Sequence, residues 1–191
     1  MQRCLLCVIL MLSAFGVTPG NAAPEGLTVG FGPQYFLPLF GPAKDLGPNL
    51  GAVMTISWTP GDSSFALVGR SGLWRFTGSP DEDFEATVVP FLVGSDYRLA
   101  VAPGTSLILR LLAGAAWLKT RGGGDRADPP FEDAQFADRE LRLAGSGGVL
   151  AQYELSEHLS VESGVVVDLI YFQESEYPGF LGFPITLVAR F

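Results

Sequence analysis

The sequence predicts an all-β fold, an eight-stranded antiparallel up-and-down β-barrel that crosses a membrane. Three observations support this prediction. Segments of alternating apolar and polar residues recur along the chain, their connections alternate between long and short, and the face opposite the apolar one carries glycine and ionisable residues. Composition agrees with it, because 17% of the 191 residues are charged and 24 are glycine, whereas ordinary soluble domains have roughly 25% charged residues and 7% glycine.

The charge balance excludes nucleic acid as a partner. The chain carries 12 basic and 20 acidic residues, whereas nucleic-acid-binding domains are basic. Intrinsic disorder is also excluded, because disordered chains combine low hydrophobicity with high charge, and 48% of this chain is hydrophobic.

Residues 1–22 are predicted to be a cleaved secretory signal peptide, and 23–191 to be the barrel domain. A positive charge at Arg3 precedes an apolar run, and the small residues that follow it end at Ala22. The alternative is a membrane anchor, but about 14 apolar residues fall short of the roughly 20 that a spanning helix needs.

Both cysteines of the chain, Cys4 and Cys7, lie inside this signal segment. The barrel domain therefore has no cysteine for a disulfide, a thiolate nucleophile or a metal ligand.

Eight segments of period-two alternation follow, separated by Gly, Pro and Asp. In chain order, we expect strands over 27–37, 50–58, 65–76, 86–101, 106–119, 140–155, 159–172 and 183–191.

The connections between these segments predict the architecture. The first, third, fifth and seventh, which are 38–49, 77–85, 120–139 and 173–182, are longer than every even-numbered one. This alternation is typical of outer-membrane barrels, which have tight periplasmic turns and longer outer loops. We therefore expect the bacterial outer membrane, with both termini on the periplasmic side because the number of strands is even.

The predicted apolar face is turned outward. In the strand 183–191, Ile185 and Leu187 lie on one face and Thr186 and Arg190 on the other. A soluble barrel would turn the apolar face inward. Two residues fit the pattern poorly. Trp74 has lumen parity, which means that its position in the alternation would turn its side chain into the lumen, and Pro90 interrupts a strand. A β-bulge beside either residue would restore the register.

Aromatic residues are predicted to form girdles at both ends of the strands, as expected at membrane interfaces. The set consists of Tyr35, Trp117 and Tyr171 near the outer ends and Trp58, Tyr97 and Tyr153 near the periplasmic ends.

The alternation of side chains along the strands predicts that the lumen holds nearly equal numbers of basic and acidic residues. The basic residues are arginines, which pair well with carboxylates in a confined polar space. We interpret the set as a structural ion-pair network, and the alternative is a narrow selective pore. Its members are Arg70, Arg98, Arg110, Arg142 and Arg190 with Asp96, Glu154, Glu162 and Asp168.

The C-terminal segment Ile185–Phe191 alternates and ends in Phe, and it resembles the signal that bacterial outer-membrane barrels present to their assembly machinery; its outward residues are Ile185, Leu187, Ala189 and Phe191. The segment 153–162 similarly resembles the penultimate hairpin of small OmpA/OmpX-like barrels. The resemblance implies outer-membrane residence, the barrel assembly machinery as a partner, and contact with outer-membrane lipid and lipopolysaccharide. It implies no particular activity.

Acidic residues gather in the expected outer loops 77–85 and 120–139. We expect these loops to contact an extracellular ligand. The acidic residues could bind Ca²⁺ or Mg²⁺, or a basic partner. Because the loops lack the Asp/Asn/Gly spacing of a dedicated calcium loop, we expect no metal and no cofactor.

An enzymatic alternative rests on His158 and Ser160, with Glu174 as a third member. A His–Ser pair with an acid could activate a hydroxyl for acyl transfer, and the spacing resembles that of outer-membrane lipid A deacylases. His158 falls in an expected periplasmic turn, however, whereas lipid A lies in the outer leaflet. The sequence therefore favours a non-enzymatic barrel that acts in envelope structure, adhesion or partner binding.

Overall fold

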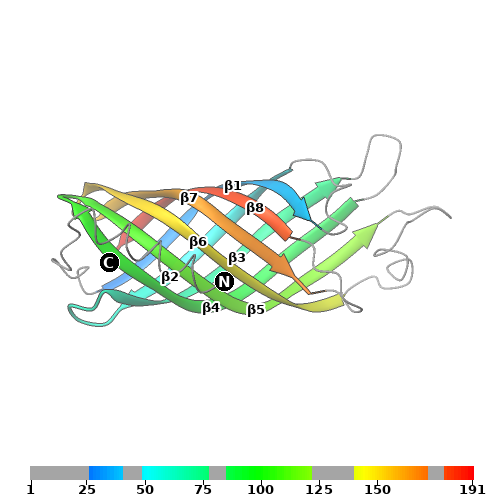
Figure 1. Ribbon diagram of the computed structural model, residues 1–191, viewed down its shortest axis with the longest axis horizontal. Coiled ribbons are helices and arrows are strands. Elements are labelled where there is room, and N and C mark those ends of the chain that lie inside the picture. Colours follow the sequence, from blue (N-terminus) through cyan, green and yellow to red (C-terminus); the bar gives the residue numbers. More distant parts are fainter. Residues whose placement is uncertain (1–25, 41–48, 78–84, 122–139, 172–178) are drawn as a thin grey trace, which may run out of the picture.

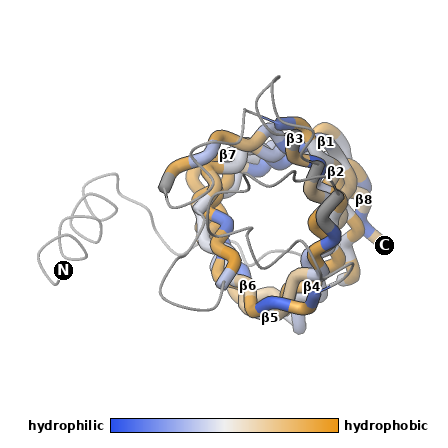
Figure 2. The backbone as a smooth tube through the Cα atoms, turned by 90° about the vertical axis from the view of Figure 1, so that its right-hand side faces the viewer, coloured by the Kyte–Doolittle hydropathy of each residue, from blue (hydrophilic) through white to orange (hydrophobic). Residues whose placement is uncertain are grey.

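The computed structural model describes residues 26–40, 49–77, 85–121, 140–171 and 179–191, which form a closed antiparallel barrel (Figures 1 and 2). Each strand pairs with the next, and β8 pairs with β1. The predicted fold is confirmed. The strands are β1 (Gly26–Phe40), β2 (Asn49–Thr59), β3 (Phe65–Thr77), β4 (Glu85–Ala102), β5 (Thr105–Arg121), β6 (Glu140–Ser156), β7 (Leu159–Ile170) and β8 (Gly179–Arg190).

The expected signal peptide lies outside the described residues, as do most of the two acidic loops. No helix within the described ranges is long and apolar enough to span a membrane.

Three short connections, β2–β3, β4–β5 and β6–β7, lie at one end of the barrel together with the C-terminus, at the left of Figure 1. We name this the turn end, and the opposite end the far end. The β4–β5 connection is the dipeptide Pro103-Gly104, and Gly104 has a φ of 69°. Proline followed by a residue of positive φ is the pattern of a type II turn, which requires glycine at the second position.

The barrel is apolar on its outer wall and mixed inside. Outward-facing side chains such as Leu111, Leu141 and Val93 are exposed, and Asp96, Asp168 and Glu162 on the alternate parity are buried. The wall is glycine-rich where strands approach closely; at Gly148, for example, a Cβ atom would run into the backbone of β7. This inside-out polarity follows directly from the period-two pattern of the strands.

The largest extensions beyond the predicted ranges are at the far ends of β1 and β8, and these extra residues pair with each other. β1 continues to Phe40 and β8 begins at Gly179, with Leu37 opposite Leu181 and Pro38 opposite Phe180. The Gly and Pro residues of these segments resemble a loop, but 179–182 have pairing partners on both β1 and β7, and the extra residues of β1 pair with β8. Conversely, β7 ends at Ile170, two residues before the predicted end.

The suggested β-bulge beside Trp74 or Pro90 is wrong. β3 pairs with β4 in one constant register from Phe65–Tyr97 to Thr77–Glu85, and the β4–β5 register shifts only at Ala100/Ala102. Trp74 is a lumen residue, and it is 1% exposed. Pro90 also faces inward, and the paired positions between β3 and β4 skip the residues opposite Pro90 and Val89, as expected beside a residue that has no N–H to donate.

Candidate functional site

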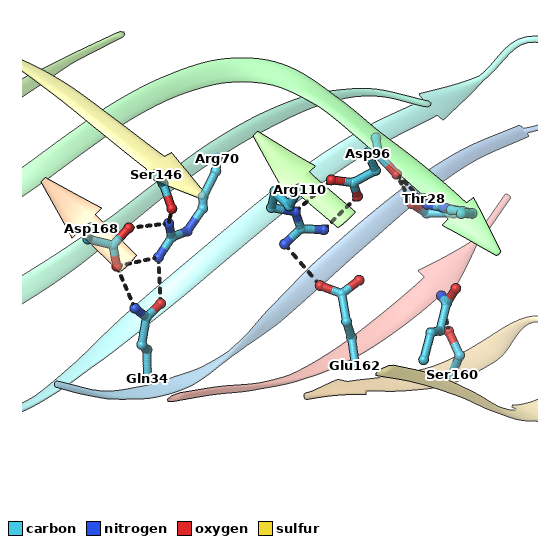
Figure 3. A network of polar contacts seen from close by, with 12 residues as sticks. Thr28, Gln34, Arg70, Asp96, Arg110, Ser146, Ser160, Glu162 and Asp168 are labelled. Carbon is cyan, nitrogen blue, oxygen red and sulfur yellow. Dashed lines mark hydrogen bonds and ion pairs between the residues drawn. The ribbon is translucent and has the colours of Figure 1, made fainter. Parts of the chain in front are cut away.

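The lumen is the candidate site, because the predicted ionisable residues are on the inward parity of their strands. The structure divides them into two buried clusters and two ion pairs near the barrel ends, rather than one continuous network. Figure 3 shows the two buried clusters lying apart along the lumen.

The first cluster, which we name the Arg70 cluster, consists of Gln34, Arg70, Ser146 and Asp168 (Figure 3). Arg70 Nη1 lies 2.7 Å from Asp168 Oδ1 and donates at 2.7 Å to Ser146 Oγ. Its Nη2 donates to Gln34 Oε1 at 2.6 Å, and Gln34 Nε2 donates to Asp168 Oδ2 at 2.8 Å. The cluster ties β3 to β7, which lie on opposite sides of the ring, and also to β1 and β6.

A glycine on β8 makes room for this cluster. Gly182 faces inward, and a Cβ atom built there would run into the side-chain amide of Gln34 and into Val166. The absence of a side chain at Gly182 therefore lets Gln34 bridge Arg70 and Asp168.

The second cluster, which we name the Arg110 cluster, consists of Asp96, Arg110 and Glu162 (Figure 3). Asp96 and Arg110 are register partners on β4 and β5, and Arg110 donates to both Asp96 oxygens, at 2.8 and 2.7 Å. Arg110 Nη1 also lies 3.0 Å from Glu162 Oε1 on β7. One guanidinium group thus neutralises two buried carboxylates in a bidentate and a single contact.

Neutral polar side chains and the charged Arg98 line the lumen between the Arg110 cluster and the turn end. Thr28 and Ser57 hydroxyls lie 2.6 Å apart, and Arg98 Nη2 donates to Ser57 Oγ at 3.1 Å. Among the described residues Arg98 Nε has no hydrogen-bond partner, although the side chain is buried.

The other two predicted arginines lie near the barrel ends. Arg142 forms an ion pair with Glu140 on its own strand, at the far end of β6. Arg190 lies 3.2 Å from Glu154 at the turn end, and the Glu154 side chain is 43% exposed. The ion pairs given for the described part of the chain therefore fall into separate groups along the lumen.

Aromatic residues pack together in the far-end lumen, a cluster of which the sequence pattern predicts only Trp74 on the lumen side. Phe36 lies 4.8 Å from Trp74 and 6.0 Å from Phe76 between ring centroids, and Phe76 stacks on Phe180 at 4.7 Å. We name these four residues the aromatic plug. All four have lumen parity, so the alternation carries the signal, but the expectation of a small and polar lumen conceals it.

The structure does not bring His158 and Ser160, the described residues of the catalytic alternative, together in one site. Ser160 is buried in the lumen and its Oγ accepts a hydrogen bond from Gln152 Nε2 at 2.9 Å, whereas His158 is exposed in the β6–β7 turn. Glu174 lies outside the described residues. Among those that are described, no group of three or more His, Asp or Glu side chains is arranged to hold a metal ion.

The residues assigned to the girdles and to the assembly signal lie on the outer wall. Tyr97 is half-buried and its ring centroid lies 4.7 Å from that of Phe65; Ala189 is also half-buried. The others are exposed: Tyr35, Trp58, Trp117, Tyr153, Tyr171, Ile185, Leu187 and Phe191.

No protein-family model matches the chain, and no curated protein matches its sequence. Solved structures match it in fold. Neisserial surface protein A aligns with a TM-score of 0.60 at 9% identity, over 87% of this chain and 97% of its own.

Two further structures are similar. Ail of Yersinia pestis, in complex with the heparin analogue sucrose octasulfate, aligns with a TM-score of 0.55 at 11% identity, over 88% of this chain and 100% of its own. OprG of Pseudomonas aeruginosa, an outer-membrane protein, aligns with a TM-score of 0.52 at 10% identity, over 90% of this chain and 98% of its own. The chain therefore has the fold of small eight-stranded outer-membrane β-barrels.

Proposed function

We propose that this chain is a non-enzymatic integral protein of the bacterial outer membrane, with both termini in the periplasm, acting in envelope structure, adhesion or partner binding. The observation that carries the proposal is the inside-out polarity of a closed barrel. Leu111 and Leu141 are each 72% exposed, whereas Asp96 and Asp168 are fully buried. This distribution is unfavourable in water and favourable in lipid, where the closed barrel also leaves no strand edge unpaired.

The side chains that occupy the lumen favour the interpretation of the barrel as a rigid scaffold rather than as a pore. Ion pairs cross the interior in the Arg70 and Arg110 clusters, and the aromatic plug occupies the far end. An eight-stranded barrel is just wide enough for its own side chains. We therefore expect no discrete conductance from the purified protein in planar bilayers.

Partner contact is assigned to the acidic outer loops, 77–85 and 120–139. The Ail structure contains a heparin analogue, sucrose octasulfate, which is polyanionic. The acidic residues of these loops favour the opposite charge, because like charges repel at an interface. A basic protein surface is accordingly the expected class of partner.

Export and insertion are assigned to the two ends of the chain. Residues 1–22 would direct secretion, and the outward residues of the last strand would bind the barrel assembly machinery. Ile185, Leu187 and Phe191 are exposed on the outer wall, so they are accessible to such a partner before lipid covers them.

Cell fractionation combined with heat-dependent migration in detergent gels tests the location. The protein should be recovered with outer membranes, require detergent for extraction, and migrate faster before boiling than after it. Recovery in the soluble periplasmic fraction, without a heat shift, would overturn the proposal.

Loop exchange tests the proposed role of the acidic loops in partner binding. Replacing 120–139 by a short neutral turn should abolish binding to a basic protein surface, whereas His158→Ala and Ser160→Ala should leave binding unchanged. Loss of fatty-acid release from lipopolysaccharide in either of these two variants would instead identify a hydrolase.

A further inference from the structure

The basic residues are distributed unevenly between the two faces of the barrel wall. Among the side chains that the structure describes, only Arg75 and Lys119 are basic and have outward parity. The other basic side chains have inward parity: Arg70, Arg98, Arg110, Arg142 and Arg190.

These two outward cations lie in one row of the sheet. Arg75 on β3 is the register partner of Thr87 on β4, and Thr87 is the register partner of Lys119 on β5. Neighbouring strands are about 4.8 Å apart, so the row places the backbones of Arg75 and Lys119 roughly 10 Å apart, with Thr87 between them. Both long side chains can converge on one group from this spacing.

The row lies directly beyond the apolar part of the wall. The preceding outward residue toward the turn end is Leu73 on β3, Val89 on β4 and Trp117 on β5. On all three strands the wall therefore changes from apolar to polar at this row, and the indole of Trp117 is of the kind that lies at membrane interfaces.

Within the described residues, this polar edge is confined to β3, β4 and β5. Apolar or aromatic side chains continue toward the far ends of the other strands and are exposed at Leu39, Leu50, Leu141 and Tyr171. A general preference for water at the barrel rim would not select three adjacent strands, whereas a bound lipid headgroup would.

We propose that Arg75, Thr87 and Lys119 form a binding site for a phosphate group of lipopolysaccharide in the outer leaflet. The proposal rests on the proposed function, because that function places the far end of the barrel in the outer leaflet. A guanidinium group and an ammonium group complement the charge of a phosphate, and the hydroxyl donates a further hydrogen bond. Cations near the membrane surface attract anionic lipid headgroups, and this attraction falls off with distance from the surface.

The test compares lipid retention by detergent-purified protein. Wild-type protein and the double variant Arg75→Gln/Lys119→Gln are mixed with lipopolysaccharide, with dephosphorylated lipopolysaccharide, with phosphatidylglycerol or with inorganic phosphate, and retained lipid is measured by native mass spectrometry. We expect the wild type to prefer phosphorylated lipopolysaccharide, and the double variant to bind it about thirtyfold more weakly, as two lost charges imply.

The exchange variant Arg75→Lys/Lys119→Arg is the matched control, because it keeps both charges on the same strands and should stay within about threefold of wild type. Each variant must show the heat shift of a folded barrel. Equal retention by the wild type and the double variant would overturn the site, as would equal binding of dephosphorylated lipopolysaccharide, phosphatidylglycerol or inorganic phosphate. A barrel that fractionates with outer membranes but lacks this preference leaves the proposed function intact, whereas a soluble protein refutes that function itself.

Discussion

Arg70 and Arg98 face the same lumen from neighbouring strands, β3 and β4, yet their surroundings differ. Arg70 is bonded to Asp168, Gln34 and Ser146 in a closed set of contacts. Arg98 donates through its guanidinium to Ser57, and its Nε finds no partner in the described part of the chain. The position of a residue in the alternation along its strand therefore determines whether its side chain lies inside the barrel. The side chains across the lumen then determine whether a buried charge stabilises the barrel.

The far-end half of the lumen, which holds the Arg70 cluster, is accordingly bonded differently from the turn-end half. Burial does not separate the two halves, because Asp168 and Phe36 at the far end and Asp96 toward the turn end are all fully buried. The difference is one of bonding, since the turn-end residues include neutral pairs such as Gln152 and Ser160. Substitutions in the two halves should therefore differ in their energetic cost.

The largest effect is expected from Asp168→Ala. The substitution leaves the buried Arg70 guanidinium with only the neutral partners Gln34 and Ser146, and removing one member of a buried ion pair costs about 3–5 kcal/mol. Urea unfolding in phospholipid vesicles, followed by the heat-dependent gel shift, measures the free energy of unfolding.

The matched substitution at the turn end is Glu154→Ala, which also removes the carboxylate partner of an arginine, Arg190. Because Glu154 is substantially exposed, its loss should cost about 1 kcal/mol or less. Equal losses for the two variants would contradict the distinction between the two halves.

A smaller effect is expected from Phe36→Ala in the aromatic plug. Phe36 contacts Trp74 and Phe76 and is fully buried, so truncation leaves a cavity and costs about 3 kcal/mol. The same urea titration measures the loss, and planar-bilayer recording tests closure. A stable variant that unfolds like wild type would show that the plug packs loosely.

Gly182→Ala should cost about 1–3 kcal/mol by overpacking, because the added methyl group meets the amide of Gln34 and Val166. The double variant Gly182→Ala/Gln34→Ala separates the causes. Shortening Gln34 frees space for the methyl group, so the added cost of Gly182→Ala should be smaller in the Gln34→Ala background. If the cost of the alanine is the same in both backgrounds, the clash with Gln34 is not its source.

The comparison also shows what alternation in the sequence can and cannot reveal. The inward positions of Arg70, Arg110 and Asp168 follow from period two, because a strand has only two faces. Their pairing does not follow from it, since the contact between β3 and β7 exists only once the ring has closed.

The contacts made by neutral and apolar residues of the lumen are the hardest to predict from the sequence. Gln34 and Ser146 carry no charge that would mark them, and Phe36 and Phe180 look like lipid-facing residues by composition although their parity is inward. The start of β8 was also missed, because Gly179 and Gly182 resemble a loop until the pairing with β1 and the proximity of Gln34 explain them.

The smallest effect is expected from Arg98→Met, with Arg70→Met as its matched control. When Arg98 is removed, Asp96 and Glu162 both keep Arg110 as a partner, so no buried carboxylate is left unpaired. Replacing a buried charge by an apolar side chain of similar length is then close to neutral, within about 1 kcal/mol.

In the control, Arg70→Met leaves Asp168 with Gln34 as its remaining hydrogen-bonded side chain, and the uncompensated carboxylate should cost about 3 kcal/mol or more. Urea unfolding of both variants in the same vesicles provides the comparison. A loss of about 3 kcal/mol for Arg98→Met as well would mean that the two carboxylates of the Arg110 cluster need a second cation, and the turn-end half would then be as tightly coupled as the far-end half.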